Sequence, residues 1–401
     1  MHKIPYSKPW LTSDEERATA HTISSGRLIL GPEVRAFETS LATFTGRQRA
    51  VAVTSGTTAL QLALHALGVN QHYSVLVPAY TWVATWNVVH WLGAEPVMID
   101  VDPSTFCIDP NDFERALASC SRTHRAILPV HMFGFRVDPT WLDAMVHRHN
   151  LTLVGDGCCA FGGEHQGLRC GAWTPVECLS FHPRKVITTG EGGAILTDDH
   201  ELADRLERLR DHGAHRSREQ RRQTTQGGLM TPEFPEPGHN FRMTEMQGAL
   251  GRVQMERVHT LIQARKTVAS RYDELIAAQI PWLKLPPGQH DPGRVLTFYP
   301  VQLQIPEASP TQILAMKTHL VTFMASHGIA VRTPMIDLVN QPFTRESAKG
   351  YDFPGAQHTF LHTLGLPFFP QMTREQSETV VQKLAEFTPT LQALLKSGAS
   401  S

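Results

Sequence analysis

The sequence predicts an α/β protein, with a large, mostly parallel sheet domain followed by a smaller α+β C-terminal domain. Short β-branched runs alternate with helix-period segments in the first half of the chain, and one long helical stretch begins after Met243. Strands that alternate with helices imply a parallel sheet covered on both faces. The length of 401 residues agrees with this division, because chains of this size form about two to three domains.

Several short apolar runs are predicted to be the strands of the large sheet. Each is rich in β-branched residues and is bounded by polar or glycine-containing segments. They are residues 50–54, 74–78, 95–100, 125–130, 151–156, 176–181 and 193–197. Between the first two runs, residues 57–67 place Leu60, Ala63 and Leu64 on one face of a predicted helix.

The second half of the chain predicts a different arrangement. Residues 244–280 form one long helical pattern without a strand inside it, and a break rich in proline and glycine follows. The remaining predicted elements are a strand within 296–305, a helix near 311–327 and a last helix over 373–395. We therefore expect a large domain over residues 1–258 and a small domain over residues 259–401.

The charge balance excludes some classes of partner. The chain has 37 Lys and Arg against 38 Asp and Glu, a net charge of −1. Nucleic acid or an anionic membrane as main partner would need a clustered basic surplus. No stretch approaches the ~20 apolar residues of a membrane helix, and the N-terminus lacks the apolar core of a signal peptide. We expect a cytoplasmic protein.

The cysteines and histidines show no metal-binding pattern. The six cysteines lie at positions 107, 120, 158, 159, 170 and 178. They form neither a CxxC pair nor a Cys/His zinc spacing, and none of the 21 histidines belongs to an HExxH motif. We therefore expect thiols in a reducing compartment and no bound metal.

A candidate phosphate site lies between a predicted strand and the helix that follows it. Ser55, Gly56, Thr57 and Thr58 stand at this junction. Free amides at the N-terminus of a helix, with a glycine that permits close approach, bind phosphate. The alternative is that Ser55 or Thr57 only caps the helix.

Three further candidate site residues follow this junction along the chain. Asp156 closes a predicted strand, at the edge where open α/β sheets bind ligands, and could pair with a protonated ring nitrogen. Lys185 follows another strand and could form a Schiff base with an aldehyde cofactor. Trp82 could stack on a planar ring. The alternatives are a loop-capping aspartate, a surface lysine and a core tryptophan that shares one helical face with Trp86.

At these residues the chain resembles the DegT/DnrJ/EryC1/StrS family of pyridoxal-phosphate-dependent nucleotide-sugar aminotransferases, and the resemblance covers nearly its whole length. It is carried by GRLILGPEVRAFE, TSGTTALQLAL, PAYTWVAT, GAEPVMIDVD, LPVHMFG, SFHPRKVITTGEGGAILT, GHNFRMTEMQGALGRVQ and LGLPFFPQMT. The resemblance implies the type I aminotransferase fold, with a PLP-binding large domain and pyridoxal 5'-phosphate (PLP) as cofactor.

The resemblance also implies roles for individual residues. Lys185 matches the lysine that holds the cofactor covalently and acts in catalysis, and Asp156 matches the partner of the ring nitrogen. Trp82 matches the aromatic residue stacked on the ring. The residues that match contacts to the cofactor phosphate are Gly56, Thr57, Ser180 and Asn240. The match of Asn240 is to a residue that reaches the cofactor of the neighbouring subunit, which implies a homodimer with shared active sites.

The chain departs from the family pattern at two places. Cys159 stands where many members carry Gln or Glu, three residues after the aspartate, so the usual contact to the ring hydroxyl of the cofactor is expected to change. The stretch TPMIDLVNQPF lacks the histidine often found before its Gln-Pro pair. Family dehydratases replace the lysine with histidine, and Lys185 argues against that branch.

The function that these matches imply is amino transfer in two half-reactions, for amino-sugar biosynthesis. L-Glutamate is the expected donor, and a keto sugar linked to a nucleotide is the expected acceptor. Three alternatives concern the acceptor, the class of protein and one loop. The acceptor could be a ketocyclitol or another non-nucleotide ketone, and the protein could be a non-catalytic cofactor-binding regulator, although no basic DNA-binding extension is present. Arg216, Arg218, Arg221 and Arg222, in the charge-rich run 204–222, could clamp a diphosphate or belong to a solvated loop.

Overall fold

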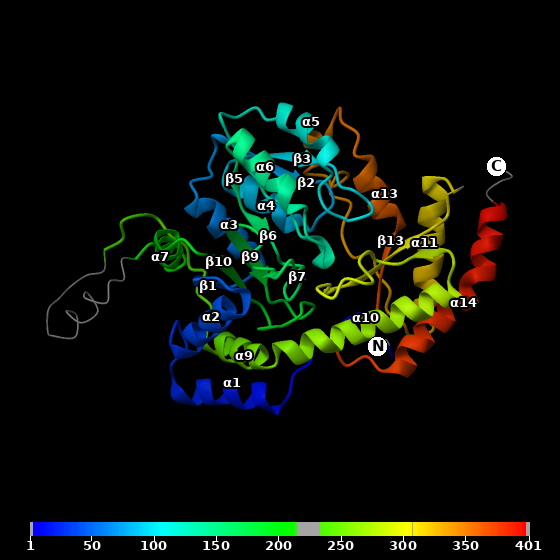
Figure 1. Cartoon of the computed structure of the whole chain (residues 1–401), viewed down its shortest axis with the longest axis horizontal. Helices are drawn as coiled ribbons and strands as arrows, with labels where there is room; N and C mark the ends of the chain where they lie inside the picture. Colours follow the sequence, from blue (N-terminus) through cyan, green and yellow to red (C-terminus); the bar gives the residue numbers. More distant parts are fainter. Residues whose placement is uncertain (1–2, 215–232, 307, 398–401) are drawn as a thin grey trace.

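The computed structural model describes residues 3–214, 233–306 and 308–397, and Figure 1 shows their arrangement. The helices of these residues are α1 (Ser13–Ser25), α2 (Pro32–Thr45), α3 (Gly56–Ala66), α4 (Val83–Trp91), α5 (Phe113–Ala118), α6 (Pro139–His149), α7 (His200–Leu209), α9 (Glu245–Glu256), α10 (Val258–Gln279), α11 (Pro310–Ser326), α12 (Arg345–Ala348), α13 (Pro354–His362) and α14 (Arg374–Ser397). The strands are β1 (Arg49–Val53), β2 (Tyr73–Pro78), β3 (Glu95–Ile99), β4 (His124–Ile127), β5 (Thr152–Leu153), β6 (Gly155–Asp156), β7 (Glu164–His165), β8 (Leu168–Arg169), β9 (Val176–Ser180), β10 (Gly193–Thr197), β11 (Leu283–Lys284), β12 (Tyr299–Leu303) and β13 (Thr363–Leu366).

The large lobe contains the mostly parallel sheet that the sequence predicts. One part has the strand order β3-β2-β4-β5, and all its pairs are parallel. The other has the order β1-β10-β9-β6, in which β6 is parallel to β9 and the remaining pairs are antiparallel. The predicted strand 151–156 is divided into β5 and β6, and it connects the two parts. Asp156 therefore lies near the middle of the whole sheet.

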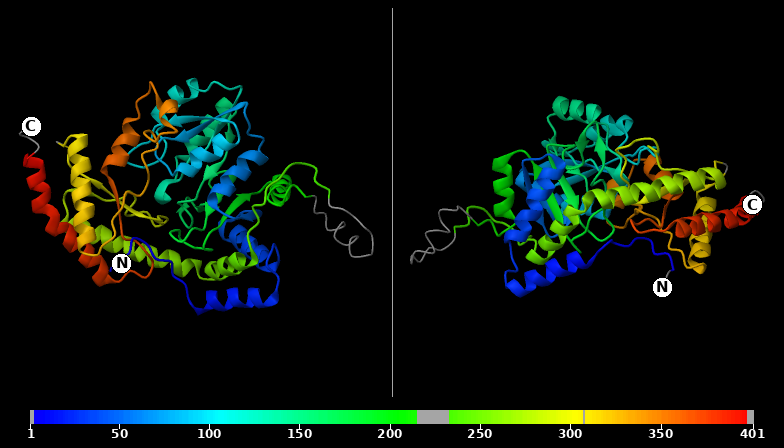
Figure 2. Two further views of the ribbon diagram at one scale, coloured as in Figure 1. Left: turned by 180° about the vertical axis from the view of Figure 1, so that it is seen from behind. Right: turned by 60° about the horizontal axis from the view of Figure 1, so that its bottom comes forward.

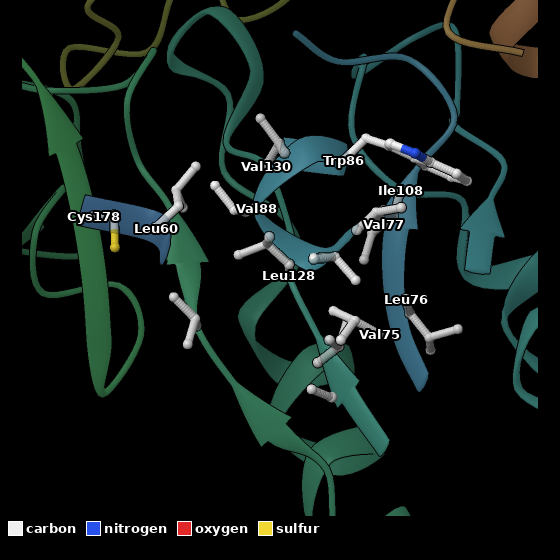
Figure 3. Close-up of a cluster of buried hydrophobic side chains, with 14 of the residues drawn as sticks. Leu60, Val75, Leu76, Val77, Trp86, Val88, Ile108, Leu128, Val130 and Cys178 are labelled. Atoms are coloured by element: carbon white, nitrogen blue, oxygen red, sulfur yellow. The ribbon is translucent and has the colours of Figure 1, made fainter. Parts of the chain in front are cut away.

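Side chains alternate along the strands of this sheet, so apolar residues point to both of its faces. Helices cover both faces. Val51 and Val53 of β1 belong to the core cluster that contains Leu60 of α3. Ala52 points the other way, into the cluster that contains Phe37 of α2. Figure 3 shows part of the first cluster, where Leu60 lies beside Cys178 of β9.

The helix that bears the candidate phosphate site begins where the sequence predicts it. The Ser55 hydroxyl accepts a hydrogen bond from the Thr58 amide at 3.1 Å, and the Thr58 hydroxyl accepts one from the Ser55 amide at 2.9 Å. This reciprocal pair is a capping box, which satisfies amides that have no partner within the helix. Ser55 is thus the cap of α3, and Gly56 and Thr57 are its first two residues.

The predicted long helical stretch is two helices. It contains no strand, but Arg257, with φ −108° and ψ 8°, separates α9 from α10. Figures 1 and 2 show that α10 runs from α9, below the large sheet, to the small lobe. Val258 packs in the core of the large lobe and Tyr272 in the core of the small lobe. Because one helix serves both cores, the domain boundary between residues 258 and 259 stays a prediction.

The small lobe has the predicted α+β character. Its sheet has the order β11-β12-β13, and α11 and α14 pack against each other beside it. The strand expected within 296–305 is β12, and the two expected helices are α11 and α14. Within the described ranges, no helix combines the length and apolar character needed to cross a lipid bilayer.

The charge-rich run that begins at residue 204 leaves the described part of the chain. The helix α7 ends at Leu209, as expected for a helix end within this run. The four arginines proposed as a diphosphate clamp, at positions 216, 218, 221 and 222, lie outside the described residues.

Candidate active site

The residues predicted from the sequence gather around one cavity of about 300 Å³. The predicted residues that line it are Gly56, Thr57, Trp82, Asp156, Cys159, Ser180 and Lys185. Asn240 does not line this cavity; it is exposed and forms a β-bridge with Asp211. A larger cavity of about 630 Å³ lies near Phe135, Arg136 and Arg294, and none of the predicted site residues lines it. Seven of the predicted site residues therefore share the smaller cavity, and none lines the larger one.

One end of the cavity is the amino end of α3. A Cβ atom at Gly56 would lie 2.8 Å from the Cβ of Ser180 and 2.9 Å from the Sγ of Cys158. Only glycine fits in this close contact, so the start of α3 packs directly against Ser180 and Cys158. The first amides of a helix and its dipole attract anions. With the Ser180 hydroxyl beside them, these groups form a cradle that suits phosphate.

The Asp156 carboxylate lies in the interior of the same cavity. It is 4% exposed, and its two oxygens accept hydrogen bonds from the Thr85 hydroxyl and the Cys158 amide, each at 3.1 Å. Burial raises the pKa of Asp156, although these hydrogen bonds and the charge of Lys185 oppose the rise. A cation beside Asp156 would favour its ionised form. The carboxylate thus caps a turn and can also pair with a protonated ring nitrogen.

Trp82 is open to the cavity, and one prediction about it is wrong. Its side chain is 53% exposed, whereas that of Trp86 is 2% exposed, so the two do not share one helical face. The reason is that α4 begins at Val83, and Trp82 is its N-cap with an extended backbone (φ −76°, ψ 143°). The alternative of a core tryptophan therefore applies to Trp86, while Trp82 offers an open indole face.

The amine of Lys185 also reaches the cavity, so it is no ordinary surface charge. Its Nζ donates a hydrogen bond to the Sγ of Cys159 at 3.1 Å and lies 5.7 Å from the centre of the Phe298 ring. Burial lowers the pKa of Lys185, but Cys159, Cys158 and Asp156 together outweigh this effect and hold it above its usual value. The group is therefore an ammonium in the cofactor-free protein, and it lies within reach of a ligand in the cavity.

The backbone of Lys185 is held from the small-lobe side by a residue that the sequence analysis missed. Arg265 of α10 is 1% exposed, and it donates hydrogen bonds to the carbonyls of Lys185 at 2.8 Å and Thr297 at 3.2 Å. Burial lowers the pKa of Arg265 to about 10. The Thr297 hydroxyl donates to the carbonyl of Cys159 at 2.7 Å. These contacts fix the lysine and the cysteine relative to each other.

The two residues that the sequence analysis missed differ in how readily the sequence could have identified them. Thr85 follows Trp82 by three residues in PAYTWVAT, so its place near the cavity could have been found from that motif. Arg265 is 80 residues from Lys185 in sequence, inside a helix with no distinguishing pattern. No local signal points to it.

These groups suit one kind of ligand. A planar ring could place a phosphate on the cradle at Gly56, a ring nitrogen at Asp156 and an aldehyde near Lys185, with one face towards Trp82. Amine, carboxylate and anion cradle are the donor set that such a molecule needs. The residues of the cavity therefore fit the cofactor that the sequence resemblance implies.

Comparisons with known proteins agree with this chemistry. The model of the DegT/DnrJ/EryC1/StrS aminotransferase family matches residues 9–385. The chain is 32% identical, over 96% of its length and 97% of the relative's, to the spore coat polysaccharide biosynthesis protein SpsC of Bacillus subtilis strain 168. It is 27% identical to the sugar aminotransferase CalS13 of Micromonospora echinospora, with a TM-score of 0.82 over 96% of this chain and 99% of that chain. The PLP form of Spr1654 from Streptococcus pneumoniae is 25% identical, with a TM-score of 0.86 over 97% and 99% of the two chains.

Proposed function

Because the chain belongs to the DegT/DnrJ/EryC1/StrS aminotransferase family and is a sugar aminotransferase with the type I fold, we propose that it transfers an amino group from L-glutamate to a nucleotide-linked keto sugar. The observation that carries the proposal is the Lys185 amine, which shares one cavity with the Asp156 carboxylate and the amino end of α3. The names of two relatives, a polysaccharide biosynthesis protein and a sugar aminotransferase, support a sugar as acceptor.

The cofactor of the proposed reaction is PLP. When bound, PLP supplies an electron sink that stabilises a carbanion at the carbon bonded to the transferred nitrogen. Gly56, Thr57 and Ser180 would bind its phosphate, Asp156 would bind its ring nitrogen, and Trp82 would stack on the ring. The PLP form of Spr1654 supports this assignment, since that chain is similar to this one over nearly its whole length.

Lys185 has two tasks in this proposal. Its amine would hold PLP in the cavity. When free, the same amine would take a proton from the α-carbon of the amino donor and return one, as a general base and then a general acid. Arg265 holds the backbone carbonyl of Lys185, and Thr297 holds that of Cys159, the residue to which the amine donates.

Asn240 belongs to a proposed homodimer with shared active sites. Its side chain is exposed and outside the cavity of its own subunit. We propose that it reaches the cofactor phosphate of the partner subunit. A cytoplasmic location, expected from the sequence, is part of the same proposal.

An absorbance measurement tests the first half-reaction. Purified protein is mixed with PLP, and its spectrum is recorded before and after L-glutamate, beside Lys185→Ala. The proposal predicts a visible band that glutamate bleaches, and a mutant without the lysine-linked band. A wild-type protein without such a band would reject the proposal. A panel of nucleotide-linked keto sugars and ketocyclitols, added to the bleached enzyme, then identifies the acceptor class.

A further inference from the structure

The contact between Cys159 and Lys185 joins a thiol and an amine inside an open cavity. The Sγ and Nζ atoms lie 3.1 Å apart, and both residues line the cavity of about 300 Å³. The proposed amino transfer needs Lys185 but assigns no chemical step to the sulfur atom. A thiol and an amine this close together can react with each other once the sulfur is oxidised.

The backbones of Cys159 and Lys185 are both held by hydrogen bonds from the same pair of residues, so the positions of the two residues are fixed relative to each other. Thr297 binds the backbone of Cys159, and Arg265 binds the backbones of both Lys185 and Thr297. A reaction between two groups is favoured when they are already positioned at contact distance.

The geometry places the amine where it can capture an oxidised sulfur. The thiolate is the form of cysteine that reacts with peroxides, and the Sγ atom of Cys159 lies in the open cavity, 3.1 Å from Nζ. Burial lowers the pKa of Lys185, but its contacts with Cys159, Cys158 and Asp156 hold it above its usual value, so the amine gives up a proton before it attacks.

We propose that Cys159 and Lys185 form a peroxide-sensitive pair that closes into a sulfur–nitrogen cross-link whenever the amine is free. In the first step, hydrogen peroxide oxidises the Cys159 thiol to a sulfenic acid and is reduced to water. In the second step, the neutral amine of Lys185 attacks the sulfur, the S–OH bond breaks, and the hydroxide leaves as water with a proton from the amine. The sum is one thiol, one amine and one peroxide giving one S–N bond and two waters.

The cross-link is a reversible lock. A small thiol attacks the S–N bond, returns the lysine amine and leaves a disulfide that a second thiol reduces. The cross-link itself depends only on the two side chains, whereas its effect on amino transfer rests on the proposed role of Lys185. A cofactor bound to the lysine engages the amine and so protects the pair.

The neighbouring Cys158 provides a matched control. Its Sγ is turned towards β9, where it lies 3.8 Å from the carbonyl of Cys178, and it packs beside Gly56. The two cysteines are adjacent in sequence and line the same cavity, but the Lys185 amine donates to Cys159. A Cys158–Cys159 disulfide would have the same mass as the cross-link, so the two variants must be compared.

The test is mass spectrometry of the full chain after dilute hydrogen peroxide, with and without bound PLP. In the cofactor-free protein we expect a loss of two hydrogen atoms, about 2 Da, and a cross-linked peptide that contains Cys159 and Lys185. Dithiothreitol should reverse it, and bound PLP should slow it by about tenfold or more, since the amine is engaged. Cys158→Ser should keep the cross-link. Cys159→Ser and Lys185→Ala should abolish it.

Other products would overturn the proposal. Oxygen addition to Cys159 without a link to Lys185 would do so, as would a product lost in Cys158→Ser. A link that retains an oxygen atom between sulfur and nitrogen would reject the direct bond. The measurement needs no turnover, so a protein that forms the cross-link but never reacts with an amino donor would reject the proposed function alone.

Discussion

Two parts of the cavity are positioned in different ways. The amino end of α3 is organised largely by sequence neighbours, because Ser55 and Thr58 cap the helix and Gly56 lets it pack closely against Ser180. The corner around Lys185 is organised from a distance, by Arg265 of α10, which lies 80 residues further along the chain. The phosphate cradle therefore depends on a local motif, and the reactive amine depends on the packing of a helix that serves both lobes.

This difference has a consequence for substitutions. Changes within the cradle should affect how tightly the cofactor binds, while the amine stays in place. Changes on α10 should affect what the amine does without touching the cradle, because Arg265 reaches Lys185 only through its backbone carbonyl. Each of the following substitutions either separates these two effects or shows that they cannot be separated.

The largest effect is expected for Asp156→Asn, between the two parts of the cavity. It keeps the size of the side chain but removes the charge that pairs with a protonated ring nitrogen. Loss of one such electrostatic contact slows catalysis by about a hundred- to a thousandfold. Single-turnover rates with L-glutamate measure it. Thr85→Val, which removes one hydrogen bond to this carboxylate, is the milder matched change, and an Asp156→Asn enzyme of wild-type rate would contradict the assignment.

The next effect concerns the cradle itself. Gly56→Ala places a Cβ 2.8 Å from that of Ser180, so Ser180 and the start of α3 must move apart and the phosphate cradle is distorted. We expect PLP to bind about a hundredfold more weakly, the loss of about 3 kcal/mol in charged hydrogen bonds. Titration of the visible absorbance band measures the affinity. Thr57→Val keeps the backbone amides and should weaken binding less, and equal losses in both variants would argue against distortion of the cradle.

A buried acid on β9 should contribute a part of the stability that depends on pH. Glu177 is fully buried, accepts hydrogen bonds from the amides of Trp173 and Thr174, and faces His131 at 3.5 Å. Burial raises the pKa of Glu177 to about 7.

The sign of that dependence follows from the raised pKa. The folded protein keeps the Glu177 proton to higher pH than the unfolded chain, so the stability it contributes is present below about pH 4 and is lost as the pH rises through about 7. The difference in the free energy of unfolding between the wild type and Glu177→Gln, both free of cofactor, should fall by about 3 kcal/mol as the pH rises from about 4 to about 7. This difference isolates Glu177, because burial also lowers the pKa of the neighbouring His131 to about 3, which changes the stability of both proteins in the opposite sense. Denaturant unfolding at several pH values measures it, and a difference that does not vary with pH would assign the dependence elsewhere.

Substitution of Arg265, which holds the backbone of Lys185, should have a smaller effect, but one that tests whether the two parts of the cavity are independent. Arg265→Met removes the donors to the carbonyls of Lys185 and Thr297, which should lower the free energy of unfolding by about 2 kcal/mol. Because the amine loses its fixed position, kcat should fall by about tenfold while PLP affinity stays within about threefold. Arg265→Lys should recover part of kcat. A loss of PLP affinity equal to that of Gly56→Ala would show that the two parts of the cavity are not independent.

The sequence predicted the groups of the cavity better than their supports. Gly56, Asp156 and Lys185 stand in motifs at strand ends, where α/β sheets bind ligands, and the structure brings them to one cavity. The face of Trp82 could not be predicted, because it depends on whether α4 begins before or after that residue. Arg265 could not be predicted either, since its partners are distant in sequence. The sequence motifs supply the reactive groups, whereas contacts between residues distant in sequence determine how firmly those groups are positioned.

The smallest expected effect separates capping from phosphate binding at α3. Ser55→Ala removes the hydroxyl that accepts from the Thr58 amide, and the loss of an N-cap costs about 1 kcal/mol of stability. The amides of Gly56 and Thr57 remain, so PLP affinity should change by no more than about threefold. Thermal unfolding and the absorbance titration, made on the same preparation, give both numbers. If affinity falls as far as in Gly56→Ala, the Ser55 hydroxyl binds the cofactor phosphate directly, and the capping contact describes only the free enzyme.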